Sequence, residues 1–64
     1  STEIIPFNNV AVVTANHTGN LGTNPSVTVV NPNNLVIQGE VSYITNTQLT
    51  ITFTSPQTGN VYLN

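Results

Sequence analysis

The amino-acid sequence predicts an all-β protein, a small antiparallel β-sandwich of five or six strands. Thr and Asn each occur eleven times among the 64 residues. Thr, Val and Ile favour strands, whereas Asn, Gly and Pro favour the turns between them. Residues 48–55 alternate apolar side chains with threonines, and this period of two is typical of a strand with one buried face. No segment has the apolar spacing of an amphipathic helix.

The first part of the chain is the least regular. Two isoleucines precede Pro6, and proline cannot donate a hydrogen bond to a strand ladder, so residues 1–9 are predicted to form an edge or a crossing segment. Residues 10–15 form a candidate strand whose two faces both carry apolar groups. The loop 16–25 has no strand pattern and is the longest connection expected.

The remaining sequence predicts four strands in an antiparallel meander. The expected strands are 26–30, 35–44, 48–55 and 60–63. Short Asn- and Thr-containing turns separate the first three, and the Pro- and Gly-containing segment 55–59 is expected to be the turn before the last. Gly39 lies inside a strand pattern, which predicts a bulge or a close approach by another backbone.

A single domain of this size has a small core. A chain of 64 residues buries only about 60% of the surface that its unfolded form exposes. Small folds usually add disulfides, a structural metal or association with other chains. Cysteine is absent, which excludes disulfides and thiolate zinc sites. Because residues 10–15 are apolar on both faces, we expect one face to contact another subunit of a homo-oligomer.

The apolar residues divide into an expected core and an expected oligomer interface. The core positions are Val10, Val12, Val27, Val29, Ile37, Val41, Leu49, Ile51, Phe53, Val61 and Leu63. The interface positions are Ala11, Val13, Val30 and Ile44. At about 25 cal/mol per Å² of apolar surface buried, an interface of ordinary size adds stabilisation comparable to the net stability of a small domain. Self-association is therefore expected to be obligatory for folding.

The charge composition excludes several classes of partner. The chain has no Lys or Arg, so it cannot neutralise phosphates, the contact that supplies most of the affinity for nucleic acid. The same absence excludes a polybasic attachment to anionic lipid. Apolar runs such as residues 10–13 are far shorter than the roughly 20 residues needed to cross a bilayer. A surface with so few titratable groups and no trypsin site favours an extracellular setting.

The sequence offers little for catalysis. Glu3 and Glu40 are the only carboxylate side chains, and nothing in their positions indicates the carboxyl pair of a glycosidase. His17 is the only imidazole and Asp is absent, so a hydroxyl nucleophile would lack an orienting third group. A hydrogen bond that braces the loop is a better role for this histidine than metal ligation. We therefore expect no enzyme, no metal and no cofactor.

A neutral glycan is the small ligand that this composition favours most, because amides, hydroxyls and aromatic faces bind neutral sugars without charge. The candidate residues are Asn16, His17, Asn20 and Asn24 on the long loop, with Tyr43 or Tyr62 as a stacking face. The alternative interpretation is that the asparagines fill turns and the tyrosines pack at strand ends. Both interpretations stay open on the sequence.

A series of short motifs runs in order from the long loop to the end of the sequence. It consists of His17, Asn20-Leu21-Gly22, Pro25-Ser26-Val27-Thr28-Val29, Gly39-Glu40-Val41-Ser42-Tyr43, Leu49-Thr50-Ile51-Thr52-Phe53 and Thr58-Gly59-Asn60-Val61-Tyr62-Leu63-Asn64. This series resembles a small β-domain at the C-terminus of many phage tail-fibre and other virion appendage proteins. That family usually opens with His-Asn-Leu-Gly, whereas Thr18 and Gly19 interrupt the motif here.

The resemblance implies an extracellular, trimeric, β-sandwich-like module that ends a fibre or spike and has no catalytic activity. Residues 1–64 would form a single β-domain, with 1–9 as the edge or crossing segment and 10–64 as the appendage-like module, in the C-terminal part of a longer chain. We expect a structural module of a virion appendage that acts by oligomeric β assembly, with host-surface attachment as an additional role.

Three alternatives to this function stay open. The first is a self-polymerising extracellular filament subunit that donates residues 4–13 to the sheet edge of a neighbour. The second is a receptor-binding module for a host-surface glycan. The third is a capsid decoration protein, which would bind head particles and not tails.

Overall fold

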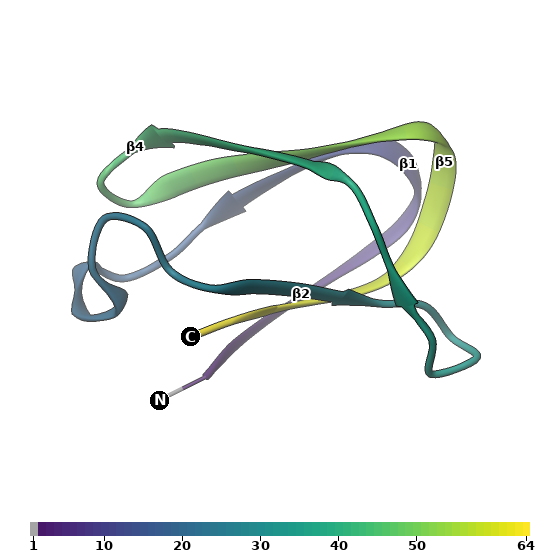
Figure 1. The fold of residues 1–64 in the computed structure, drawn as a ribbon, viewed down its shortest axis with the longest axis horizontal. Coiled ribbons are helices and arrows are strands. Elements are labelled where there is room, and N and C mark those ends of the chain that lie inside the picture. The colour runs from purple at the N-terminus through teal and green to yellow at the C-terminus, as the bar shows by residue number, and fades with distance from the viewer. Residues whose placement is uncertain (1) are drawn as a thin grey trace.

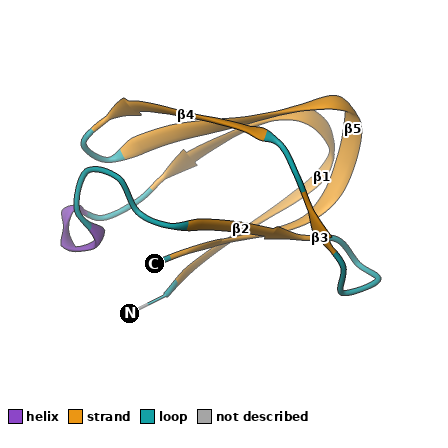
Figure 2. Ribbon diagram, viewed as in Figure 1, coloured by secondary structure: helices purple, strands orange, loops and turns teal. Residues whose placement is uncertain are grey.

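The computed structural model of the protein describes residues 2–64, and its regular secondary structure is almost entirely β-strand. The strands are β1 (Glu3–Asn16), β2 (Val27–Val30), β3 (Val36–Ile37), β4 (Glu40–Thr45) and β5 (Gln48–Leu63). A 3₁₀ turn, η1 (Gly19–Leu21), lies in the loop after β1 (Figure 2). All strand pairs are antiparallel. The fold is therefore the small antiparallel all-β fold that the sequence predicts.

The central strand of the sheet is β5. Along one edge it pairs with β1, from Glu3 opposite Leu63 to Asn16 opposite Gln48. Along its other edge, the first part of β5 pairs with β4 and the last part pairs with β2. β3 extends the sheet beyond β2. Every other strand except β3 is thus joined directly to β5.

β1 and β5 bend together near their middle, so the sheet folds over on itself in two layers (Figure 1). One layer contains β4 and the other contains β2 and β3, while β1 and β5 contribute to both. The register shifts at the bend: between the pairs Phe7–Gly59 and Val12–Thr52, β1 advances five residues and β5 advances seven. Asn9 adopts a positive φ of 53° there, a conformation that Asn tolerates better than most residues.

The core lies between the two layers. Its buried members are Val13, Ala15, Val29, Leu49, Ile51, Phe53, Val61 and Leu63. Five partly buried residues pack against them: Ile5, Phe7, Leu21, Val27 and Ile37. The rings of Phe7 and Phe53 stack with their centroids 5.6 Å apart. All core residues of the strands have odd numbers. The same alternate residues of β5 face inward on both sides of the bend, and outside the bend the registers place odd-numbered residues of β1 and β2 opposite odd-numbered residues of β5.

The predicted meander is wrong in two places. Residues 55–59 form no turn, because β5 continues through them as a bent strand. The predicted strand 35–44 divides into β3 and β4, with a break at Gln38 and Gly39. A Cβ on Gly39 would lie 2.6 Å from Ile51 Cγ2, so this glycine lets the chain cross closely over core side chains. The predicted hairpin formed by β4 and β5 is confirmed.

The two faces of β1 are reversed relative to the prediction. Val13 is buried with 5% exposure, whereas Val10 and Val12 are 36% and 53% exposed. Directly opposite residues of antiparallel strands share a face, and Val13 lies opposite Ile51. The strong alternation of β5 therefore decides which face of β1 is inward. Val13, expected at an oligomer interface, belongs to the core of its own chain, and Val10 and Val12 do not.

Candidate functional site

Two of the three candidate asparagines accept hydrogen bonds from other side chains of the protein. The side chains of Asn16, Asn20 and Asn24 are exposed. Asn16 Oδ1 accepts a hydrogen bond of 3.1 Å from Gln48 Nε2, and Asn24 Oδ1 accepts one of 3.1 Å from the neighbouring Thr23 hydroxyl. These contacts agree with asparagines that stabilise turns and strand ends.

The two candidate tyrosines lie on opposite faces of the sheet. Tyr62 lies between the buried residues Val61 and Leu63 of β5, so it points away from the core. Tyr43 lies on the inward side of β4, and its hydroxyl donates a 2.8 Å hydrogen bond to the carbonyl oxygen of Pro25. One sugar could not stack on both rings, and Tyr43 fixes the end of the long loop against β4.

His17 is buried, with 6% exposure, immediately after β1. Its backbone N–H donates to the carbonyl of Thr47 at 2.8 Å. Nδ1 lies 2.9 Å from the Thr18 carbonyl oxygen, and because a carbonyl only accepts, Nδ1 must carry the proton. Nε2 is buried without a partner among the described residues. The histidine thus braces the start of the loop and is not open to a ligand from solvent.

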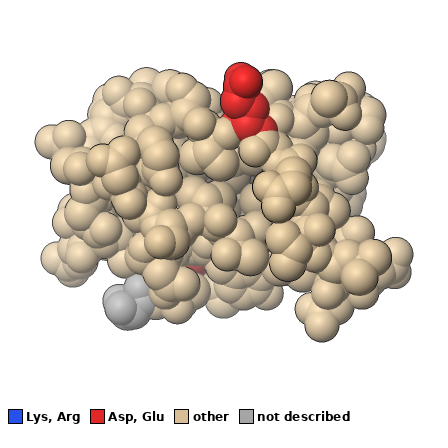
Figure 3. All heavy atoms as spheres, in the orientation of Figure 1, with Lys and Arg blue, Asp and Glu red and all other residues tan. Residues whose placement is uncertain are grey.

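Among the described residues, Glu3 is the only one whose side-chain carboxylate accepts hydrogen bonds from protein groups. It accepts a 2.6 Å hydrogen bond from the Thr18 hydroxyl and a 3.3 Å bond from the Thr18 N–H. The hydroxyl bond lowers the pKa of Glu3 from its ordinary value, although partial burial acts in the opposite direction. Glu40 is exposed on β4. The two carboxylates lie in different layers, because Glu3 is opposite Leu63 and Glu40 is opposite Thr52 of β5. Figure 3 shows acidic atoms at two separate places.

The described residues contain no group of three or more side chains that could hold a metal ion. Within the same range, none of the helical structure is long and apolar enough to span a bilayer.

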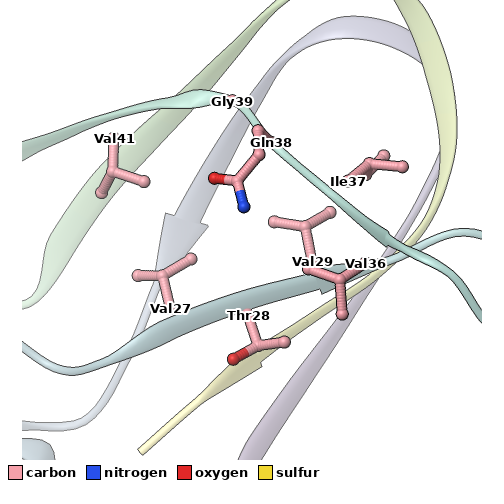
Figure 4. A pocket seen from close by; sticks show the side chains of 8 residues that line it. All are labelled: Val27, Thr28, Val29, Val36, Ile37, Gln38, Gly39 and Val41. Atoms are coloured by element: carbon pink, nitrogen blue, oxygen red, sulfur yellow. The ribbon is translucent and has the colours of Figure 1, made fainter.

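A groove opens between the two layers, at the side of the molecule where β3 leads into β4. Its volume is about 240 Å³, and it is lined by Val27, Thr28, Val29, Val36, Ile37, Gln38, Gly39 and Val41. Val41 from β4 and Val27 from β2 project into it from opposite layers (Figure 4). We call this feature the valine groove. Sequence reasoning missed it, although Val27 and Val29 on β2 and Val41 on β4 are visible as inward-facing positions of two short strands.

The strand above the valine groove is unusually exposed. All six residues of β4 are exposed, including Val41 at 36%, expected in the core, and Ile44 at 52%, expected at an interface. β4 pairs with β5 along one edge only, and the space between Val41 and β2 of the opposite layer is occupied by the groove. The remaining expected interface residues, Ala11 and Val30, are half-buried.

Exposed apolar side chains also occur elsewhere on the molecule. The full set of large ones is Ile4, Val10, Val12, Leu35, Val36, Val41, Tyr43 and Ile44. Single exposed apolar residues are common on protein surfaces. Three of them lie on β1, three on β4, and Leu35 and Val36 lie at the start of β3. The protomer therefore leaves much of its aliphatic surface uncovered.

No protein-family model matches the chain, and neither the curated proteins nor the solved structures compared with it include one that is significantly similar.

Proposed function

We propose that this protein is a non-enzymatic structural module that works as a homo-oligomer, with a trimer favoured. The observation that carries the proposal is the uncovered apolar surface of β4 and the valine groove beneath it. A second copy is the partner that best suits this surface. It would bring the same uncharged, β-branched side chains, and no cation is present that would select an acidic partner.

The energetics support association. Burying an exposed Val or Ile completely stabilises a protein by roughly 1.5–3 kcal/mol. Val41 faces inward from β4, whereas Val36 and Ile44 face outward from β3 and β4. Their exposed fractions are 36%, 61% and 52%, so covering each side chain contributes on the order of 1 kcal/mol. This gain is a large fraction of the net stability of a small domain. With a net charge of −2, identical copies also repel one another only weakly.

The setting that we propose is a virion appendage, such as the tip of a tail fibre or spike. The support for it is the ordered series of motifs from His17 to Asn64. An outer surface of amides and hydroxyls suits an extracellular particle, and attachment to a host surface would be an additional role. The filament alternative, in which residues 4–13 leave the chain, is less favoured because β1 is already paired with β5 over this segment.

Sedimentation equilibrium of the purified chain over a wide range of concentration tests the proposal. We expect a trimer that dissociates together with loss of β structure when diluted. The double substitution Val41→Thr and Ile44→Thr keeps β-branched side chains but removes apolar surface, and it should shift dissociation to higher concentration. The matched control is Thr54→Ser, on the exposed face of β5. A monomer that stays folded at every concentration would contradict the proposal.

A further inference from the structure

β1 is an edge strand with one partner. It pairs with β5 along its whole length, and no other described residue pairs with its outer edge. An unpaired edge presents a row of N–H and C=O groups that can pair with a strand of another chain. Proteins usually blunt such edges with lysine, proline or a bulge.

These protective devices occur only in the first half of β1. Pro6 interrupts the hydrogen-bonding groups of residues 3–7, and the bulge around Asn9 interrupts the strand itself. Residues 10–16, Val-Ala-Val-Val-Thr-Ala-Asn, contain no proline, no glycine and no charge. Uncharged segments of six or seven residues with high β propensity and no proline are the ones most prone to pair with other strands. We call residues 10–16 the open edge.

We propose that the open edge is a second contact between copies, in which it pairs antiparallel with the open edge of another molecule across a twofold axis. This inference rests on the proposed function, because it describes how the assembled units join. The layer formed by β4, β5 and β1 would continue into the same three strands of the second copy.

The pattern of residues suits a second copy of this chain. The inner faces of the two copies must lie on the same side of the joined sheet. With a twofold axis perpendicular to the sheet, this requires that one residue lie directly opposite its own counterpart, with the axis midway between them. An axis at Val12 places this valine opposite its own counterpart and Val10 opposite Thr14 of the second copy. Val12 and Val10, which are exposed in the protomer, then meet side chains of similar shape. Because the open edge has no charge, no like charges meet across the axis.

The contact is expected to be weak alone. The open edge contributes only seven residues from each copy, whereas an interface of standard size contains about 20–30 residues a side. Oligomers that already hold several copies present several open edges at once, and this raises the effective strength of each contact. The open edge would therefore link oligomers, while the surface around the valine groove forms them.

Cysteine cross-linking tests the proposal directly. The chain has no Cys, so a single introduced cysteine can form only an intermolecular disulfide. Val12→Cys would place two thiols opposite each other, within the Cα separation of about 4.4–6.8 Å that a disulfide allows. With oxidised glutathione, we expect covalent dimers to form on the order of a hundredfold faster than for Thr54→Cys, an exposed position on the central strand. Equal rates for the two variants would overturn the inference.

A second pair of variants keeps the test independent of one thiol. Val12→Lys adds the gatekeeping charge that natural edges use, and Thr54→Lys adds the same charge away from the edge. In sedimentation velocity, Val12→Lys should remove the species larger than the basic oligomer, whereas Thr54→Lys should retain them. If the basic oligomer forms but Val12→Cys does not cross-link rapidly, only this inference fails. If no variant associates at all, the proposed function fails as well.

Discussion

The Glu3 carboxylate at the start of β1 accepts a 2.6 Å hydrogen bond from the Thr18 hydroxyl, just beyond the end of the same strand. β1 folds back at its bulge, so its first and last residues lie in different layers of the molecule (Figure 1). The carboxylate therefore holds the two layers together at the end opposite the bend. It does so with one of only two acidic side chains in the sequence.

This contact should make stability depend on pH. The Thr18 hydroxyl lowers the pKa of Glu3 below its ordinary value of 4.5. A carboxylate with a lowered pKa stabilises the fold above its pKa in the unfolded chain, and this contribution is lost as pH falls through the lower, folded-state pKa. We therefore expect the urea midpoint of the wild type to fall on acidification below about pH 4.5, and that of Glu3→Gln to fall less.

Glu40→Gln is the matched control for Glu3→Gln, because it removes an exposed carboxylate from β4. Its pH dependence should resemble that of the wild type. If the urea midpoints of the wild type and Glu3→Gln change with pH in the same way, the contact between the Glu3 carboxylate and Thr18 does not cause the pH dependence of stability.

Gly59 should tolerate no side chain. A Cβ at this position would lie 2.2 Å from the carbonyl oxygen of Val30, and a backbone atom of a paired strand cannot move aside without breaking the ladder. Gly59→Ala should therefore destabilise the protein by at least about 2 kcal/mol. Gly19→Ala is the control, because no atom outside its chain neighbours and the backbone of its own 3₁₀ turn lies within 4 Å of the added Cβ. Chemical denaturation of both variants checks this, and similar midpoints would refute the prediction.

The Tyr43 hydroxyl should contribute measurably to stability. It donates to the Pro25 carbonyl at 2.8 Å, and loss of a typical hydrogen bond costs about 1 kcal/mol. Tyr43→Phe should lower the free energy of unfolding by about this amount. Tyr62→Phe should have little effect, since the Tyr62 hydroxyl makes no hydrogen bond to residues 2–64. Thermal unfolding of the two variants measures the difference, and a larger loss in Tyr62→Phe would be the contrary result.

Sequence periodicity predicted the strand that organises the fold but not its length. Leu49, Ile51 and Phe53 alternate so regularly that the first half of β5 was recognisable. Pro56 and Gly59 then indicated a turn, because both residues are common in turns. In the structure, the register of β1 against β5 leaves residues 53–56 without pairs to β1. A proline that lacks an N–H is therefore tolerated at the bend without ending the strand.

The faces of β1 and the valine groove could not be predicted from local patterns. Val10 to Ala15 are apolar on both sides, so only the register with β5 decides that Val13 points inward. The groove likewise depends on tertiary structure, because Val27 and Val41 approach each other only after β2 and β4 have paired with different halves of β5. His17, by contrast, was expected to brace the loop, and its burial and hydrogen bonds agree with that expectation.

The shared membership of β5 in both layers has a consequence for how the protein folds and opens. Neither layer can detach as a separate cooperative unit, because each would take half of the same strand with it. The pairing of Glu3 with Leu63 also joins residues from distant parts of the sequence, and such non-local topologies fold slowly. Amide hydrogen exchange in the two paired parts of β5, residues 48–52 and 59–63, should therefore occur only through global unfolding, with the same protection level in both.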